Sequence, residues 1–301
     1  MKKTIGIFIA ILAIAGCGRN QVGDKAAKEL PTYRIGYMIC NSKKETLERF
    51  LPMSAWLGKK LGVKFETVAI DTIKFTREIK NLDFTHSNSL LYVILHRFNG
   101  VEVLAAERKG VNDYRSQGII FSRADSGIKT IADLKGKRMI FGPMLAPTGF
   151  MSQIDLLQSN GVDPENGLAF YTIPTGSAKH EKVVYGVMFG KFDAGAIPLD
   201  NLAEMAADNR INRDDYRIIA KAKPIPYCNF AVTQKINPEL ARRFKEAVLS
   251  LTDKDTVEYD GERVKVAKRA WVKGYRDIKD SEFDVVREMA KRTNMPPYQK
   301  F

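Results

Sequence analysis

The feature that most constrains this fold is a regular alternation of short apolar runs with longer amphipathic runs, which begins at Tyr33. The run at 33–39 reads as a strand, and residues 47–61 carry apolar side chains at close to helical spacing, with Gly62 placed as a C-terminal cap would be. The run at 64–70 is strand-like again. Strands that alternate with helices predict a mainly parallel sheet with helices on both faces.

The same alternation continues along the chain and separates into two blocks. Further strands are expected at 82–86, 101–106, 114–122, 138–141, 169–173, 192–197, 216–222 and 229–233. Further helices are expected at 71–80, 88–98, 130–134, 150–157, 180–189, 200–207, 238–251 and 281–292, whereas the basic stretch 254–275 is expected to be irregular. The long strand at 114–122 and the proline-rich stretch 223–226 are the expected connections between the blocks.

Two blocks of this kind predict an α/β protein with two Rossmann-like lobes, whose mixed, mainly parallel sheets are joined by a two-strand hinge. Lobe 1 is expected to comprise 33–118 and 223–301, and lobe 2 to comprise 119–222. Ligands of α/β sheets bind beyond the carboxyl ends of the strands, so turns that follow strands should line a shared cleft. Those turns contain Cys40, Asn41, Ser87, Asn88, Asp200 and the segment 146–149.

The segment 142–151 lies between a predicted strand and a predicted helix and is rich in Gly, Pro and Thr. Free backbone N–H groups and the positive end of the dipole make a helix start of this kind an anion site. An ordinary strand-to-helix turn with a Thr cap has the same composition. The two-lobe setting favours a ligand-contacting loop.

The N-terminal residues carry the features of an export signal. Lys2 and Lys3 precede an apolar run at 5–16, which is shorter than the roughly 20 residues that a membrane span needs. The run ends in Ile14-Ala15-Gly16-Cys17, which resembles the lipobox of bacterial lipoproteins and implies cleavage before Cys17 and lipidation of its thiol. We therefore expect a signal peptide at 1–16, a lipidated tether at 17–32 and a periplasmic location anchored through Cys17.

The formal net charge of +13 favours attraction to an anionic ligand or to a membrane surface, although a basic surface without specific meaning fits equally well. Nucleic acid is not expected as the partner of an exported, lipid-anchored chain. The chain has three histidines, no Gly-x-Ser-x-Gly elbow and no metal-ligand spacing. These features argue against an enzyme, a metal site or a cofactor.

Five segments together resemble the solute-binding lipoproteins of phosphonate, phosphite and phosphate ABC importers, the PhnD-like proteins of the type II periplasmic-binding fold. They are LGKKLGV at 57–63, SGIKTIADLKGK at 126–137, GSAKH at 176–180, KFDAGA at 191–196 and DSEFDVVR at 280–287. No single segment is specific, but their order and spacing match the family over about 33–291. The resemblance implies a monomer that binds a small oxyanion between its lobes.

Family roles carry over to individual positions. The anion loop of such proteins usually reads Ser-Thr-Ser-Gly, and Ala146, Pro147, Thr148 and Gly149 stand at the matching positions. Thr148 keeps a hydroxyl and Gly149 an unhindered N–H, whereas Ala146 has no hydroxyl and Pro147 has no N–H. A hydrogen bond to a charged group is worth ~1.5–3 kcal/mol, so we expect weaker phosphonate binding unless other groups compensate.

Other positions receive ligand roles by the same resemblance, each with a plainer alternative. His180 would reach the oxyanion, or would be a surface or helix-capping histidine. Ser87 and Asn88 would face the ligand, or would serve as a helix cap. Asp200 would pair with a ligand ammonium group, or would cap a helix.

Cys40 and Cys228 fall near the expected cleft, where the family has a hydroxyl and an acidic residue, and their neighbours Asn41 and Tyr227 are further candidates for ligand contact. The two cysteines lie close together and form a reversible bridge, or they are two small buried apolar residues.

The expected function is a solute-binding lipoprotein that captures a small oxyanion and delivers it to an ABC permease and ATPase. The alternative is an envelope ligand-sensing lipoprotein of the same fold. It would bind a different small anion or polar solute and be redox-linked through Cys40 and Cys228.

Overall fold

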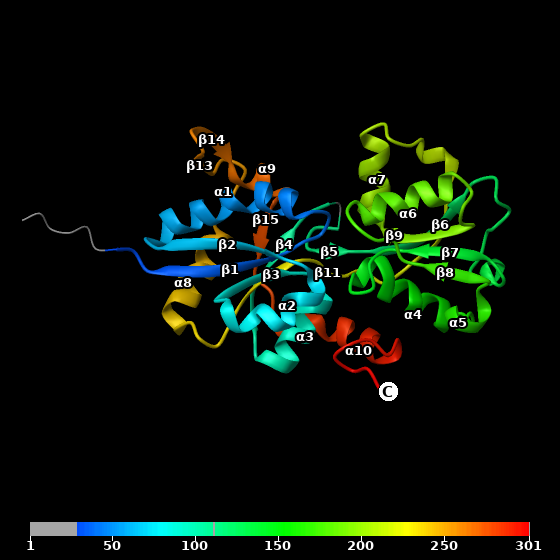
Figure 1. Cartoon of the computed structure of the whole chain (residues 1–301), viewed down its shortest axis with the longest axis horizontal. Helices are drawn as coiled ribbons and strands as arrows, with labels where there is room; N and C mark the ends of the chain where they lie inside the picture. The colour runs from blue at the N-terminus through cyan, green and yellow to red at the C-terminus, as the bar shows by residue number, and fades with distance from the viewer. Residues whose placement is uncertain (1–28, 111, 301) are drawn as a thin grey trace, which may run out of the picture. The chain divides into compact units, whose positions relative to one another are not determined.

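The computed structural model describes residues 29–110 and 112–300, and two open mixed sheets carry its fold (Figure 1). The expected signal peptide, Cys17 and most of the expected tether lie outside the described residues. We call the six-stranded sheet and its helices lobe 1, and the five-stranded sheet and its helices lobe 2. The mixed α/β fold predicted from the sequence is confirmed.

The sheet of lobe 1 has the strand order β15-β4-β12-β3-β1-β2. Its strands are β1 (Thr32–Met38), β2 (Lys64–Ile70), β3 (Phe84–Ser87), β4 (Glu102–Arg108), β12 (Asn229–Val232) and β15 (Gly274–Arg276). Strands β1 to β4 run in one direction, and β12 and β15 run in the other. All four strands that precede lobe 2 therefore bring their carboxyl ends to the same edge.

The sheet of lobe 2 has the order β10-β6-β9-β7-β8. Its strands are β6 (Gly118–Arg123), β7 (Arg138–Phe141), β8 (Phe170–Thr172), β9 (Ala194–Pro198) and β10 (Tyr216–Lys221). Only β6 runs against the others. The predicted mixed, mainly parallel character therefore holds for the strand directions in both sheets.

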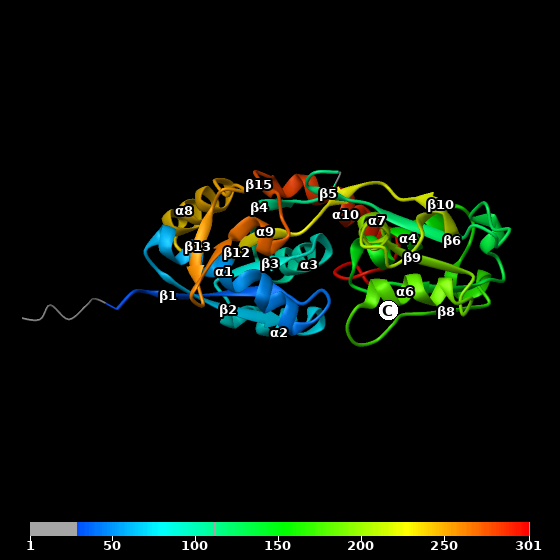
Figure 2. The ribbon, with the colours of Figure 1, turned by 90° about the horizontal axis from the view of Figure 1, so that it is seen from above.

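A short antiparallel ribbon connects the two sheets. It pairs β5 (Arg115–Ser116) with β11 (Ile225–Pro226), and both strands lie between the lobes in Figures 1 and 2. The single long strand predicted at 114–122 is wrong, because the chain changes partners at Gln117. Ser116 pairs with Ile225 in the ribbon, whereas Gly118 pairs with Pro198 in lobe 2. The Gln117 side chain donates to Ala222 O (2.8 Å) and holds the chain at this break.

The helices occupy the predicted places with shifted ends. Lobe 1 carries α1 (Lys43–Leu61), α2 (Phe75–Glu78), α3 (Ser89–Asn99), α8 (Pro238–Leu249), α9 (Val266–Ala270) and α10 (Asp284–Arg292). Lobe 2 carries α4 (Ser152–Ser159), α5 (Pro164–Gly167), α6 (Lys179–Met188) and α7 (Leu199–Ala207). Gly62 ends α1 in the left-handed conformation, as predicted, while Ser42 caps its start four residues earlier than the apolar periodicity indicated.

The stretch expected to be irregular is ordered. It forms a hairpin of β13 (Thr256–Tyr259) and β14 (Glu262–Lys265), then α9, and then β15, which pairs with the edge strand β4. Only Val257 and Val264 of the hairpin strands are buried. The charged residues between them hid the strand pattern in the sequence.

Helix α10 contacts both lobes. It packs on α3 of lobe 1 and on α4 of lobe 2, and Figure 1 shows it beneath the space between them. Arg292 makes a two-pronged ion pair with Asp155 of α4, with contacts of 2.8 and 2.9 Å. Val286 and Met289 belong to a buried apolar cluster that includes residues of both lobes. None of the helices in the described ranges combines the length and apolar character that a membrane span needs.

Candidate functional site

A cavity of about 1410 Å³ lies between the loops of the two lobes. Lobe 1 contributes the loops that follow β1, β2, β3 and β4 and the residues that precede β12. Lobe 2 contributes the loops that follow β7, β8 and β9. The cavity thus lies beyond the carboxyl ends of parallel strands, where α/β sheets place their ligands. It is larger than the ~300–1,000 Å³ of common ligand pockets.

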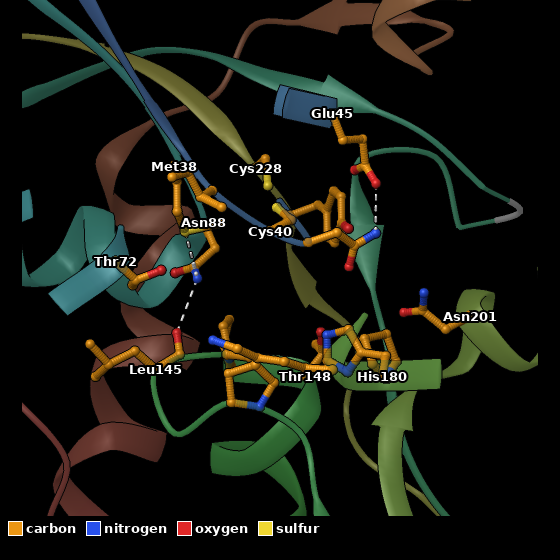
Figure 3. Close-up of a pocket in the computed structure, with 18 of the residues that line it drawn as sticks. Met38, Cys40, Glu45, Thr72, Asn88, Leu145, Thr148, His180, Asn201 and Cys228 are labelled. Carbon is orange, nitrogen blue, oxygen red and sulfur yellow. Dashed lines mark hydrogen bonds between the residues drawn. The ribbon is translucent and has the colours of Figure 1, made fainter. Parts of the chain in front are cut away.

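The structure brings seven of the ten candidate ligand residues to this cavity and leaves three outside its lining. Those that line it are Cys40, Asn41, Asn88, Thr148, His180, Tyr227 and Cys228. Figure 3 labels Cys40, Asn88, Thr148, His180 and Cys228 among the residues around the cavity. Those outside its lining are Ser87, Gly149 and Asp200.

The predicted anion loop has a different backbone from the expected helix start. Residues Pro147–Met151 form a π-helical turn ahead of α4. The N–H groups of Gly149 and Phe150 both donate to Ala146 O, at 3.2 and 3.0 Å. The expectation that Gly149 offers a free N–H is therefore wrong, because the wide turn leaves the Ala146 carbonyl to accept both donors. Thr148 remains at the cavity, 4% exposed, and its hydroxyl accepts from Ser116 Oγ at 3.3 Å.

His180 faces this loop from the first turn of α6. Its ring packs directly against Gly142 and Gly149. A Cβ atom added to either glycine would lie too close to His180 Cε1, at 2.8 Å for Gly142 and 2.7 Å for Gly149. Its Nδ1 is buried and has no hydrogen-bond partner. Burial, and then the charge of Lys179, lower the pKa of His180 to about 4. The ring is therefore neutral at pH 7, and its free nitrogen is a polar group left for a ligand. The helix cap is Ala178, so His180 is not a capping residue.

Asn88 joins the two walls of the cavity. Its Oδ1 accepts from Leu91 N (2.9 Å) and caps α3, as the plainer alternative predicted. Its Nδ2 donates to Leu145 O (3.0 Å) of the loop in lobe 2, and it lies 3.3 Å from Met38 Sδ. The side chain is therefore already used by the protein. Ser87 is fully buried behind it.

Asp200 lies in the first turn of α7, where Pro198 and not Asp200 is the N-cap. The expected capping role is therefore wrong. Its carboxylate lies against Gly110, where a Cβ atom would approach Oδ2 to 2.6 Å. Burial raises the pKa of Asp200, and the charge of Lys109 opposes that rise. Lys109 itself reaches across from lobe 1 to Glu204 of α7, at 3.3 Å.

The lobe 1 wall contains a buried arginine that sequence reasoning missed. Arg49 of α1 is 9% exposed, and its Nε and Nη2 donate to Ala270 O at 3.3 and 2.9 Å. Its guanidinium lies 4.8 Å from the ring of Phe50 and 4.6 Å from that of Trp271. The sequence signal that could have identified it is its helical spacing. Arg49 lies three residues after Thr46 and four before Met53, which places a charged residue on the buried face of the predicted helix.

Behind Arg49, a buried acid–histidine pair lies at the cavity wall. His86 Nε2 is 3.0 Å from Glu107 Oε2, and both side chains are almost completely buried. Burial alone would raise the pKa of Glu107, but the His86 ring and the Arg49 charge hold it below its ordinary value. His86 also packs between Phe50 and Phe230, at ring distances of 4.7 and 4.8 Å. It is therefore a packed strand residue with a carboxylate partner that the sequence did not indicate.

Both remaining cysteines are free thiols, Cys40 exposed and Cys228 5% exposed. Figure 3 draws their side chains toward the same part of the cavity wall. Cys40 has accessible surface and lines the cavity. Burial raises the pKa of both thiols and the charge of Arg49 opposes that rise, while a Cys40 thiolate would further raise the pKa of Cys228. The alternative of two buried apolar residues is wrong for Cys40.

Charged residues of both signs line the cavity. Glu45, Asp71, Glu107, Glu181, Glu204 and Asp208 face Arg49, Lys109, Lys179 and Arg210. Several of them pair, including Arg210 with Asp208 at 3.1 Å and with Glu181 at 3.7 Å. The basic balance of the whole chain is therefore not concentrated here. In the described ranges, no cluster of three or more His, Cys, Asp or Glu residues is placed to hold a metal ion.

Comparison with known proteins gives one family and several structural relatives. The family model described as "ABC transporter, phosphonate, periplasmic substrate-binding protein" matches residues 35–283. The tetrathionate sensor histidine kinase of Salmonella typhimurium is 24% identical over 239 residues, which are 73% of this chain and 39% of that protein. The chain thus spans well under half the length of this curated relative.

Among solved structures, PhnD1 from Prochlorococcus marinus in complex with methylphosphonate is similar with a TM-score of 0.71 and 16% identity. The match covers 87% of this chain and 98% of that one. A protein from Xanthomonas citri bound to ATP gives a TM-score of 0.71 and 17% identity over 87% and 97% of the two chains. At these identities the likeness shows the fold, that of type II periplasmic binding proteins.

Proposed function

Because the chain belongs to the periplasmic substrate-binding proteins of phosphonate ABC transporters, we propose that it captures a small oxyanion of the phosphonate, phosphite or phosphate type between its lobes. The observation that carries this proposal is the pair formed by His180 and Thr148. His180, whose buried Nδ1 has no hydrogen-bond partner, and Thr148, which carries a hydroxyl, line one cavity from the same lobe. Buried polar atoms are rarely left unpaired, so a ligand atom is the natural partner of Nδ1.

Recognition would then rest on hydrogen bonds more than on net charge. His180 is neutral at pH 7 and gives one donor or acceptor, and Thr148 gives a hydroxyl. The N–H of Gly149 is already used by Ala146 O. With fewer donors than the usual family loop, each worth ~1.5–3 kcal/mol to a charged ligand, we expect weaker binding of simple phosphonates than that loop provides.

The size of the cavity suggests that capture includes closure. A cavity of about 1410 Å³ is much larger than a small oxyanion, so the lobes must approach each other for both walls to touch one ligand. We propose that the β5–β11 ribbon is the hinge between lobe 1 and lobe 2. The closed monomer would be the form that an ABC permease or a membrane sensor recognises.

We further propose that Cys17 anchors the protein to the membrane by lipidation, after removal of residues 1–16. The support is the lipobox-like Ile14-Ala15-Gly16-Cys17. Metabolic labelling with a fatty-acid probe should mark the wild-type chain and not Cys17→Ser; labelling of both would exclude this anchor.

The oxyanion proposal is tested by thermal shift against phosphate, phosphite, methylphosphonate, 2-aminoethylphosphonate and sulfate. A ligand at 100 times its Kd stabilises by ~2.7 kcal/mol, which is several degrees in Tm. His180→Ala and Thr148→Ala should each reduce the shift, with His96→Ala as the matched control because His96 does not line the cavity. If no oxyanion shifts Tm, or if both cavity variants bind as the wild type does, the proposal fails.

The second candidate is a sensing role with a different ligand. Two observations favour it: the likeness to a tetrathionate sensor histidine kinase and the two free thiols at the cavity. Tetrathionate is an anion with reactive S–S bonds, which suits a cavity that contains cysteines. Tetrathionate in the same assay decides between the two candidates. A shift with tetrathionate and none with phosphonates would favour sensing of oxidised sulfur.

A further inference from the structure

Sheet register brings Cys40 and Cys228 to one corner of lobe 1. Tyr37 of β1 pairs with His86 of β3, and Asn229 of β12 pairs with Ser87. Both neighbours of β3 therefore reach the end of β3 at about the same level. At Asn88 the chain leaves the sheet and turns into α3. Beyond the end of β3, no strand therefore separates the loop after β1, which contains Cys40, from Cys228, which precedes β12.

The gap between these two segments is one that a loop residue can cross. Two strand spacings span about 10 Å, whereas a disulfide needs Cα atoms within about 7 Å. Cys40 follows β1 and lies outside the strand ladder, so it is free to approach. Cys228 is held in place, because its carbonyl accepts from Glu107 N at 2.8 Å. Figure 3 shows both side chains directed to the same point of the cavity wall.

We propose that Cys40 and Cys228 are a reversible dithiol–disulfide pair, oxidised within the cavity by an anionic compound that contains an S–S bond. Cys40 Sγ loses its proton to cavity water and attacks one sulfur of that bond. A mixed disulfide forms on Cys40, and the other sulfur leaves as an anion. Cys228 Sγ then loses its proton and attacks Cys40 Sγ, which closes the Cys40–Cys228 disulfide and releases the second sulfur anion. In total two thiols are oxidised, one S–S bond is reduced and two protons are released.

The exposures of the two thiols set this order. Cys40 is exposed and lines the cavity, so a ligand can reach its thiol. Cys228 is only 5% exposed, so its thiol can react with Cys40 Sγ beside it but not with a free ligand. Arg49 lies beside both thiols and lowers the pKa of each, although burial outweighs its effect. A positive charge next to the attacking sulfur also attracts an anionic reactant. His180 and Thr148 line the opposite wall of the same cavity and offer hydrogen bonds to its oxygens.

This inference deepens the second candidate of the proposed function and is independent of phosphonate capture. A chain that binds no phosphonate can still react at its thiols, and a chain with inert thiols can still bind an oxyanion. The two proposals therefore fail separately.

The test uses the full chain, reduced and then freed of reductant, with S-sulfocysteine and glutathione disulfide as the two anionic probes. Iodoacetamide labelling under denaturing conditions, followed by peptide mass mapping, reports Cys40, Cys228 and Cys17 separately. In the wild type we expect both cavity thiols to become unreactive and a peptide linked through Cys40 and Cys228 to appear. Cys228→Ser should accumulate a cysteine or glutathione adduct on Cys40, whereas Cys40→Ser should leave Cys228 at least tenfold less modified.

Three results would overturn the proposal: two free cavity thiols in the treated wild type, a bridge that forms only between molecules, or equal adduct formation on both single variants. Unchanged circular dichroism and Tm of the reduced variants show that they are folded. If Cys228→Ser fails to fold, Cys228→Ala gives the same readout. Addition of a thiol reductant should restore both free thiols, and an irreversible product would contradict the reversible pair.

Discussion

The neutral, half-buried ring of His180 gives the cavity a pH dependence that can be measured. Its pKa is about 4 in the folded protein and roughly 6.5 in an unfolded chain. Between these values the unfolded state takes up a proton that the folded state does not. Folding stability is therefore present above about pH 6.5 and is lost as the pH falls towards 4. Allowing for partial exposure, we expect a loss of about 1–3 kcal/mol.

Urea unfolding of wild type and His180→Gln at pH 7 and about pH 4.5 isolates this loss from that of the carboxylates, which titrate in both proteins. We expect the wild type to lose more stability than the variant over this range. His96→Gln is the control, since His96 lies at the surface end of α3. Equal pH dependence of wild type and His180→Gln would contradict the neutral ring.

For single residues, the sequence predicted which side chains line the cavity better than it predicted the hydrogen bonds and burial around them. The family pattern placed His180 and Thr148 at the cavity, and both line it. It could not show that Gly149 N–H would be taken by Ala146 O, because that depends on a π-helical turn with no clear sequence signature. Arg49 was missed since a buried guanidinium is stabilised by Ala270 O and Trp271, more than 200 residues away in the chain.

Among the helices, α3 is the one whose cap also connects the lobes. Asn88→Ala should lose the cap, at a cost of about 0.5–2 kcal/mol, and should also release the loop at Leu145. Asn237→Ala is a matched control, because Asn237 caps α8 through Leu240 N (2.8 Å) and does not line the cavity. Both variants should lower Tm, but only Asn88→Ala should speed hydrogen exchange in 143–147. Equal exchange in the two variants would mean that the link to Leu145 does not hold the loop.

Elements with strong local signals were predicted well. Asn88 is a helix cap as one alternative predicted, Asp71 and Asn237 cap helical segments at the expected places, and the strand at 64–70 has the predicted bounds. The failures occur where distant partners decide. The strand at 114–122 breaks because its halves pair with different sheets, and 254–275 is ordered because β4 offers an edge to β15.

In the whole molecule, α10 contacts both lobes, and the ion pair between its Arg292 and Asp155 of α4 is the contact whose removal tests whether α10 restrains the lobes. Arg292 is partly exposed, so loss of its pair with Asp155 should cost less than about 1 kcal/mol in stability. We nevertheless expect Arg292→Ala to broaden the distribution of interlobe distances in single-molecule fluorescence transfer. Arg242→Ala, which removes pairs confined to α8, is the control. Identical distance distributions for the two variants would show that α10 does not restrain the lobes.

The family and the fold were accessible from sequence because they depend on the order of many weak signals. Five dispersed segments indicated the phosphonate-binding family, and the match over 35–283 confirms that assignment. The ligand was not accessible in this way. Its recognition depends on a few atoms in a cavity whose charged residues come from both lobes and are partly neutralised by each other.

The two glycines under His180 have a practical consequence for work in cells. The atoms nearest to a methyl group at Gly149 are side-chain atoms of His180 and Ala146, whereas a methyl group at Gly142 would also lie 3.0 Å from the Gly149 carbonyl oxygen. Gly149→Ala should therefore tilt the imidazole away and leave the backbone unchanged. That would yield a ligand-blind allele at normal abundance, which separates loss of capture from loss of protein in a growth or reporter assay. If the allele still responds as wild type does, uptake or signalling does not pass through this ring.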